Sequence, residues 1–178
     1  MSRIGKEPVK LADGVTASVS GQTVTVKGKL GELSYTMHEG ITAKVEDGSV
    51  VVSCADDKAL GAFHGLARAL INNMAVGVSQ GFQKQLSIEG TGFKVVLKGK
   101  ELALSLGFAS PKVFSIPDGL TVTVENDGLQ VTIKGCDKQM VGEAAARIRS
   151  YYPAEPYKGK GIKYVGEHIR RKQGKKVA

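Results

Sequence analysis

Short runs in which hydrophobic and polar residues alternate occupy the first third of the chain, and they predict β-strands. The runs are bounded by Gly, Asp and Asn and cover Val15–Val19, Thr23–Lys27, Leu33–Met37, Ile41–Val45 and Val50–Cys54. The last two runs are separated by Glu46-Asp47-Gly48, in which Asp-Gly is a strong hairpin signal. The pattern therefore predicts a β-rich segment that ends in a hairpin.

After Cys54 the hydrophobic period changes from two residues to about 3.6, which predicts a helix. Asp56 or Asp57 can cap this helix by accepting hydrogen bonds from the free N–H groups of its first turn. The hydrophobic residues that share one face of it are Leu60, Phe63, Ala67, Leu70, Ile71, Met74 and Val78.

The same order of elements recurs in the second half of the chain. Strands are predicted at Gln85–Glu89, Phe93–Lys98, Glu101–Gly107, Val113–Ile116, Leu120–Val124 and Leu129–Lys134. A second capped helix is predicted to start at Asp137. The residues expected on its apolar face are Val141, Ala144, Ala145, Ile148 and Tyr152.

Matching residues in the two halves indicate an internal duplication. The pairs are Gly40-Ile41-Thr42 with Gly119-Leu120-Thr121, Asp47-Gly48 with Asp127-Gly128, and Asp57-Lys58 with Asp137-Lys138. After a single inserted residue in the second hairpin, the offset is 80 residues. We therefore predict an α+β fold of two duplicated domains, each an antiparallel sheet packed against one helix. The first domain covers residues 1–81 and the second residues 82–152, and a basic, extended C-terminal tail follows at residues 153–178.

Positive charge is concentrated in that tail. The chain of 178 residues has a net charge of +8, and residues 151–178 contain eight Lys or Arg against two acids, Glu155 and Glu167. The preceding 150 residues contribute a net charge of only +2. A basic segment of this kind favours a polyanionic partner, so we expect the tail to determine what the protein binds.

The residue types in the tail favour RNA over other polyanions. Pro153 and Pro156 prevent the second helix from continuing, and glycines alternating with lysines let the backbone approach a phosphate chain closely. Tyrosine rings among these residues can stack on bases or sugars. The predicted RNA-binding residues of the tail are Tyr157, Lys158, Gly159, Lys160, Gly161, Lys163, Tyr164, Arg170, Arg171, Lys172, Lys175 and Lys176.

Alternative interpretations apply to the tail and to one turn. The tail is either this RNA-binding segment or a solvated basic end without fixed structure. A membrane-surface tail is disfavoured, because an amphipathic face with Leu, Phe and Trp anchors is absent. The turn Gly90-Thr91-Gly92-Phe93-Lys94 is either a tight turn with a core Phe or an RNA-facing loop with Lys94 on a phosphate.

Motifs for catalysis are absent from the sequence. Gly159-Lys160 is followed by Gly161, whereas a P-loop needs Ser or Thr at that position between a strand and a helix. His38, His64 and His168 are scattered, and no nucleophile, base or metal-ligand spacing forms around them. We therefore expect no enzyme activity, catalytic residue, cofactor, metal or small-molecule substrate. We see no signal-peptide or membrane-span pattern, and a cytoplasmic location is expected.

Three stretches carry a resemblance to a known family. They are Ser2-Arg3-Ile4-Gly5-Lys6 with Pro8; Asn72-Asn73-Met74, Gly77-Val78 and Gly81-Phe82 leading to Gly90-Thr91-Gly92-Phe93; and Glu155-Pro156-Tyr157-Lys158-Gly159-Lys160-Gly161-Ile162. With them the chain resembles, over essentially its whole length, the bacterial members of the family of the sixth large-subunit ribosomal protein. The resemblance implies two related α+β domains and a place in the ribosome beside neighbouring ribosomal proteins. It also implies binding to large-subunit ribosomal RNA near the stalk base and the region where translation factors dock.

The leading hypothesis is therefore a structural, RNA-binding constituent of the large ribosomal subunit. The alternative is a protein–protein adaptor that uses exposed sheet surfaces of the two domains. On the leading hypothesis, truncation after Tyr152 should leave both domains folded and weaken RNA binding.

Overall fold

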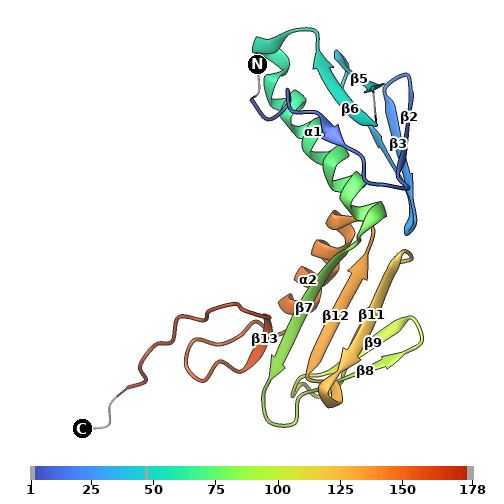
Figure 1. Ribbon diagram of the computed structural model, residues 1–178. Helices are drawn as coiled ribbons and strands as arrows, with labels where there is room; N and C mark the ends of the chain where they lie inside the picture. Colours follow the sequence, from blue (N-terminus) through green and yellow to red (C-terminus); the bar gives the residue numbers. More distant parts are fainter. Residues whose placement is uncertain (1–2, 47, 176–178) are drawn as a thin grey trace. The chain divides into compact units, whose positions relative to one another are not determined.

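The computed structural model describes residues 3–46 and 48–175, and the chain divides into two compact units (Figure 1). The first unit comprises Met1–Phe82 and Cys136–Lys138, and the second comprises Gln83–Gly135 and Gln139–Ala178. Among the described residues, neither helix combines the length and the apolar character needed to cross a membrane.

The described strands of the first unit form two three-stranded sheets. One has the order β1–β6–β5 and the other the order β2–β3–β4. Their bounds are β1 Val9–Lys10, β2 Thr16–Ser20, β3 Thr23–Gly28, β4 Gly31–Thr36, β5 Ile41–Glu46 and β6 Ser49–Cys54. The five predicted runs match β2 to β6 within two residues at each end. The sequence did not predict β1, because two residues are too few to show alternation.

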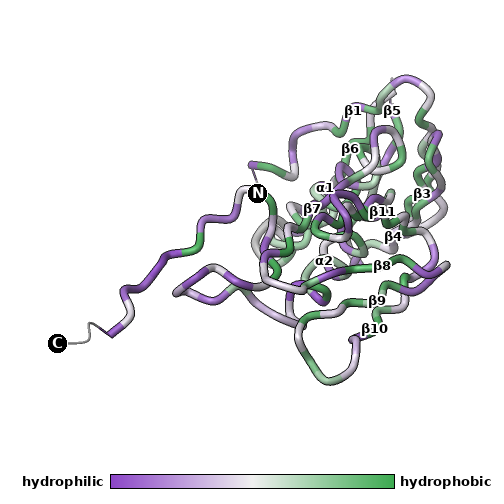
Figure 2. The backbone as a smooth tube through the Cα atoms, turned by 90° about the horizontal axis from the view of Figure 1, so that it is seen from below, coloured by the Kyte–Doolittle hydropathy of each residue, from purple (hydrophilic) through white to green (hydrophobic). Residues whose placement is uncertain are grey.

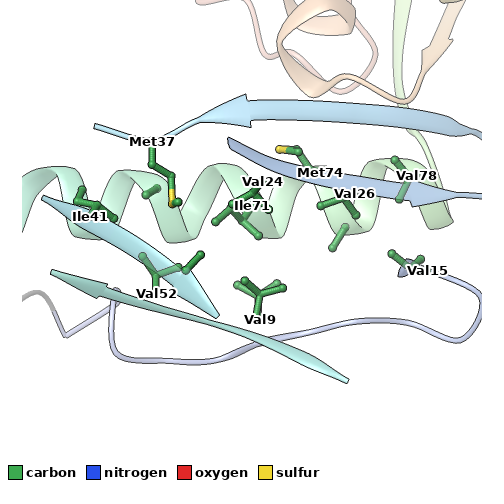
Figure 3. Packing of buried hydrophobic residues seen from close by; sticks show 14 residues of the cluster. Val9, Val15, Val24, Val26, Met37, Ile41, Val52, Ile71, Met74 and Val78 are labelled. Atoms are coloured by element: carbon green, nitrogen blue, oxygen red, sulfur yellow. The ribbon is translucent and has the colours of Figure 1, made fainter. Parts of the chain in front are cut away.

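Helix α1 (Asp57–Ser79) supplies one side of the core of the first unit. Ala67, Ile71, Met74 and Val78 are buried as predicted, and they pack with the valines of the strands. Figure 3 shows these side chains between α1 and the strands. Full burial of an aliphatic side chain stabilises a fold by about 1.5–3 kcal/mol, so these residues make a large favourable contribution to the folding of the first unit.

The prediction that Phe63 lies on the buried face of α1 is wrong. The Phe63 side chain is 41% exposed and stacks on the ring of His38, with 4.3 Å between ring centroids. His64 is buried in its place, at 3% exposure, and its Nε2 lies 3.0 Å from the Val52 carbonyl oxygen. Because this carbonyl satisfies the imidazole, a polar residue can occupy the core position. A Cβ added at Gly5 would lie 2.6 Å from the His64 ring, so the N-terminal segment packs directly on this histidine.

The second unit repeats this arrangement with one additional strand. Its sheets have the orders β11–β12–β7–β13 and β10–β9–β8. The bounds are β7 Phe82–Glu89, β8 Lys94–Lys98, β9 Glu101–Ser105, β10 Lys112–Ser115, β11 Leu120–Glu125, β12 Gln130–Gly135 and β13 Gly161–Tyr164. Helix α2 (Lys138–Ser150) buries Val141, Ala144, Ala145 and Ile148, as predicted.

The duplication is visible in the strand order. The sheet β1–β6–β5 of the first unit corresponds to β7–β12–β11 of the second, and β2–β3–β4 corresponds to β8–β9–β10. The α+β fold of two repeated domains is therefore confirmed, with two sheets in each unit where one was predicted. The inserted residue lies in the β11–β12 hairpin, whose loop forms the short 3-10 helix η1 (Asn126–Gly128).

Strand β13 is the main difference from the sequence-based description. Residues after Tyr152 were expected to form an extended tail, but Gly161–Tyr164 pair with β7 and belong to the sheet of the second unit. Ile162 is fully buried in its core. Removing every residue after Tyr152 would expose an edge of β7 and open the core. The structure therefore speaks against the expectation that this truncation leaves the second domain folded.

Candidate nucleic-acid interface

The segment that carries most of the predicted RNA-binding residues is folded into the second unit. We call residues 153–175 the C-terminal extension. Its strand β13 pairs antiparallel with β7 in the register Gly161↔Glu89 to Tyr164↔Leu86. A Cβ added at Gly161 would lie 2.7 Å from the Pro153 carbonyl oxygen, and φ there is +137°, so this position requires glycine.

The loop before β13 presents two of the predicted residues to solvent. It is closed by a hydrogen bond from the Glu155 N–H to the Lys160 carbonyl at 2.9 Å. Tyr157 lies in the turn with 55% of its surface exposed, and the neighbouring Lys158 is exposed as well. A flat ring and an ammonium group side by side on a fixed turn suit contact with a nucleotide base and its phosphate.

Two of the predicted lysines are engaged within the protein. The Lys160 ammonium lies 4.6 Å from the centroid of the Phe93 ring, within cation–π distance. The Lys163 ammonium lies 2.6 Å from a carboxylate oxygen of Glu89, and only 23% of the Lys163 side chain is exposed. Lys160 and Lys163 therefore help to hold the extension on the unit, and they contribute less free positive charge than their sequence positions indicate.

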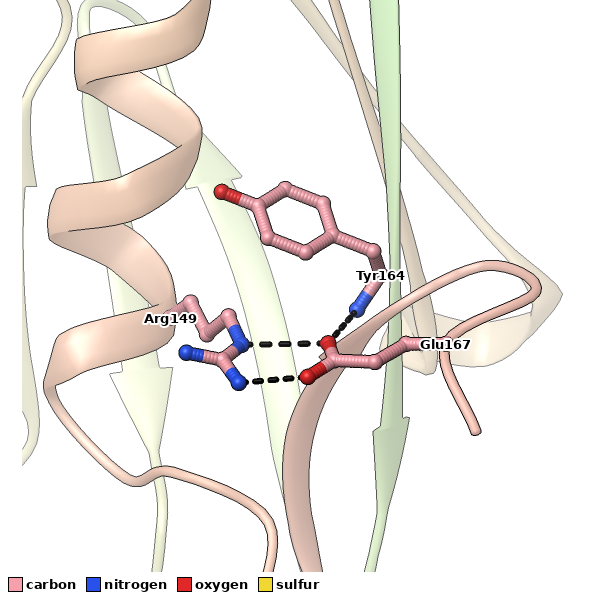
Figure 4. Close-up of polar contacts among 3 residues, drawn as sticks. All are labelled: Arg149, Tyr164 and Glu167. Carbon is pink, nitrogen blue, oxygen red and sulfur yellow. Dashed lines mark hydrogen bonds and ion pairs between the residues drawn. The ribbon is translucent and has the colours of Figure 1, made fainter. Parts of the chain in front are cut away.

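Tyr164 also contacts other residues of the second unit, next to an ion pair that holds the extension in place (Figure 4). The Arg149 guanidinium donates to both carboxylate oxygens of Glu167, at 3.1 Å and 2.5 Å, and the Tyr164 N–H donates to the same carboxylate at 2.9 Å. Arg149 and Lys84 both lie over the Tyr164 ring, at 5.7 Å and 5.6 Å from its centroid. The Tyr164 ring is thus covered by cations of the protein itself, unlike the ring of Tyr157.

The hydrogen bonds of Glu167 shift the pKa of its carboxyl group. Hydrogen bonds from Arg149 and from the Tyr164 N–H lower the pKa of the Glu167 carboxyl below its usual range. The same pairing raises the pKa of Arg149. Glu167 is therefore ionised at neutral pH, and its negative charge is balanced by a bidentate partner.

The chain then returns toward the loop before β13. The Lys172 N–H donates to the Pro156 carbonyl at 2.8 Å. Arg170, Arg171, Lys172 and Lys175 are exposed, and Figure 2 shows a mostly hydrophilic path after β13. Lys176 lies outside the described residues.

The turn at residues 90–94 combines features of both interpretations given above. Phe93 is buried, at 5% exposure, and its N–H donates to the Gly90 carbonyl at 3.2 Å, as expected for a tight turn with a core Phe. Lys94 is exposed at the start of β8. Among the described residues, no group of three or more His, Cys, Asp or Glu side chains could hold a metal ion.

The residues that anchor the extension were not predicted from the sequence. Glu89 on β7 holds Lys163, and Arg149 on α2 holds Glu167, so each pair joins side chains from different elements. The one signal available in the sequence was the alternation around Ile162 and Tyr164, which is typical of a short strand.

Comparison with known proteins supports the resemblance found in the sequence. The family described as ribosomal protein L6 matches residues 11–81 and 89–165. The large ribosomal subunit protein uL6 of Magnetococcus marinus is 52% identical over 177 residues, which cover 99% of both chains. The proteins of the same name from Brucella canis and Colwellia psychrerythraea are 50% and 49% identical over the same length and coverage. These relatives are named as ribosomal proteins and not as enzymes, in agreement with the sequence analysis. The two matched segments, the duplicated fold and the full-length similarity together show that this chain belongs to the ribosomal protein L6 family.

Proposed function

We propose that this protein is a structural constituent of the large ribosomal subunit that binds large-subunit ribosomal RNA through its C-terminal extension. Its place is in the ribosome, in the cytoplasm, near the stalk base and the region where translation factors dock. Its partners are ribosomal RNA and neighbouring ribosomal proteins.

The observation that carries this proposal is the exposure of basic side chains on a fixed segment. Lys158, Arg170, Arg171, Lys172 and Lys175 are exposed, and β13 holds the segment in the sheet of the second unit. Cations held in place lose less conformational entropy on binding phosphates than cations on a free tail. Tyr157 adds an exposed ring for stacking.

The other predicted residues take supporting roles in this proposal. Lys160, Lys163 and Tyr164 orient the extension, and Gly159 and Gly161 allow its close turns. Lys94 and Lys176 would add further positive charge.

Crosslinking in the purified ribosomal particle tests the proposal. Nucleotides of large-subunit RNA should be attached to the peptide that contains residues 157–163 and to the one that contains residues 170–175. Crosslinks restricted to the first unit would place the interface elsewhere.

A second candidate function is a protein–protein adaptor, and one observation favours it. On the sheet β10–β9–β8, Val96 and Val113 both pair with Ala103, and they are 41% and 52% exposed. An apolar row on an open sheet face suits contact with another protein. If this is the function, a protein partner should remain bound after nuclease treatment. Its binding should also be unaffected by charge reversal in the C-terminal extension.

A further inference from the structure

A hollow of about 570 Å³ lies within the C-terminal extension. Three parts of the extension form it: the loop before β13, β13 itself and the returning chain. The residues that line it are Gly159, Lys163, Glu167, His168, Ile169, Arg170 and Arg171.

Contacts on two sides keep the hollow open. The Lys172 N–H is held by the Pro156 carbonyl at 2.8 Å, which fixes the returning chain. Glu167 is held by Arg149 and by the Tyr164 N–H, which fixes the turn after β13. A ligand that enters the hollow therefore meets walls that are already in place, and this reduces the entropy lost on binding.

The charge of the hollow favours an anion. The carboxylate of Glu167 is paired with Arg149, and the nearby carboxylate of Glu89 is paired with Lys163. Arg170 and Arg171 are exposed at the wall. Because the acids are neutralised by partners in the protein, the two guanidinium groups leave an excess of positive charge. Guanidinium groups bind phosphate oxygens in a bidentate manner.

The size and the remaining lining residues indicate a group larger than phosphate. The volume lies in the range of sites for small organic ligands, which is roughly 300–1,000 Å³. His168 contributes an exposed imidazole ring and Ile169 a half-buried apolar side chain. A flat ring and an apolar surface beside two guanidinium groups match a base attached to its ribose and phosphate.

We propose that this hollow is the seat of a single unpaired nucleotide of the bound RNA. Its 5′ and 3′ phosphates lie against Arg170 and Arg171, one at each guanidinium group, and its base packs on His168 and Ile169. The inference rests on the proposed function and adds that the RNA contains a bulged or looped-out nucleotide at this point. A fully paired helix keeps its bases stacked and cannot supply such a group.

Binding of three RNAs by the full-length chain tests this seat. The probes are a hairpin with one bulged uridine, the same hairpin without the bulge, and the same hairpin with an abasic residue at the bulge. A stacked base strengthens binding by about 5- to 150-fold, so we expect the bulged hairpin to bind roughly tenfold more tightly than the other two. His168→Ala should remove this preference.

Lys134→Gln provides the matched control. Lys134 is an exposed lysine of β12 that has no place in the proposed interface, so its loss should leave the preference for the bulge intact. Equal affinity of the wild-type protein for all three hairpins would overturn the seat while leaving RNA binding itself in place. Tighter binding of free uridine monophosphate than of the bulged hairpin would also overturn it, in favour of a free-nucleotide site. Failure to bind any of the hairpins would contradict the proposed function as well as the seat.

Discussion

Removal of the Arg149–Glu167 ion pair should measurably destabilise the second unit. The pair is bidentate, and its side chains are 34% and 23% exposed, so water screens it only in part. Exposed ion pairs contribute about 0.2–1 kcal/mol, and a bidentate, partly buried pair lies at or above the upper end of that range. We expect a coupling free energy of about 1–1.5 kcal/mol between the two side chains. Glu167→Ala also removes the acceptor of the Tyr164 N–H and should cost about 1–2 kcal/mol.

A double-mutant cycle with Arg149→Ala and Glu167→Ala, followed by thermal and urea unfolding, measures this coupling. A loss of about 1–2 kcal/mol lowers the Tm of a domain of this size by roughly 5–10 °C. The pair Arg147–Glu143 on α2 is the matched control, because its side chains are 68% and 53% exposed and its coupling should be below about 0.5 kcal/mol. A coupling for Arg149–Glu167 no larger than that of the control would refute this account of the anchor.

The same pair predicts a pH dependence. The pKa of Glu167 is lower in the folded state than in the unfolded state, where it is about 4.3. The ionised carboxylate therefore stabilises the folded state fully at pH values above the unfolded-state pKa. This stabilisation is lost as the pH falls through the folded-state pKa of Glu167. The stability difference between the wild type and Glu167→Gln should therefore be constant near neutral pH and shrink on acidification below about pH 4. A difference that grows on acidification would contradict the assigned pairing.

Two further predictions concern how β13 is held. Gly161→Ala should destabilise the second unit by more than about 2 kcal/mol in urea unfolding, because the new Cβ would meet the Pro153 carbonyl. Gly166→Ala is the control, because φ there is also positive, at +85°, but no other atom lies within 4 Å of the new Cβ. This control should cost only about 1 kcal/mol. Equal losses in the two variants would remove the steric argument. Truncation after Gln173 should leave unfolding unchanged, whereas truncation after Tyr152 should lower the Tm of the second unit, as followed by calorimetry, because it removes β13. Identical unfolding of the two truncated forms would show that β13 adds nothing to the fold.

Local patterns in the sequence were sufficient to predict most of the fold. Alternation located the strands from β2 to β11, most of which bury side chains at every second position, as β3, β6 and β9 do. Strand β12 was located as well, although it buries three residues in a row, Val131, Thr132 and Ile133. Helical periodicity located α2 and four of the five residues expected on its apolar face. The fifth, Tyr152, lies beyond the end of α2 at Ser150 and is only half-buried. The duplication followed from turns and helix starts, because these positions tolerate few residue types.

Features that depend on distant partners were not predictable in this way. Strand β13 contains Gly161 and Lys163 and is short, so its pairing with β7 leaves only a weak local signal. His64 is buried because the Val52 carbonyl accepts its hydrogen bond, and a helical wheel does not include β6. The wheel instead placed Phe63 inside.

The candidate site shows the same limit. The sequence located the concentration of basic residues and singled out Tyr157, whose ring is exposed. It did not indicate that Lys163 pairs with Glu89 or that cations cover Tyr164. These contacts separate the side chains that hold the extension from those that remain available to a partner.

The salt dependence of binding to large-subunit ribosomal RNA tests the central claim most directly. Five exposed cations of the extension, Lys158, Arg170, Arg171, Lys172 and Lys175, are available to phosphates. If each neutralises one phosphate, the logarithm of the affinity should fall with the logarithm of the salt concentration at a slope of about −3.5 to −4.5. The double variant Lys158→Gln/Arg171→Gln should reduce the magnitude of the slope by roughly 1.4–1.8, and Lys134→Gln should leave it unchanged. An affinity that does not vary with salt, or a slope that the double variant leaves unaltered, would contradict the account.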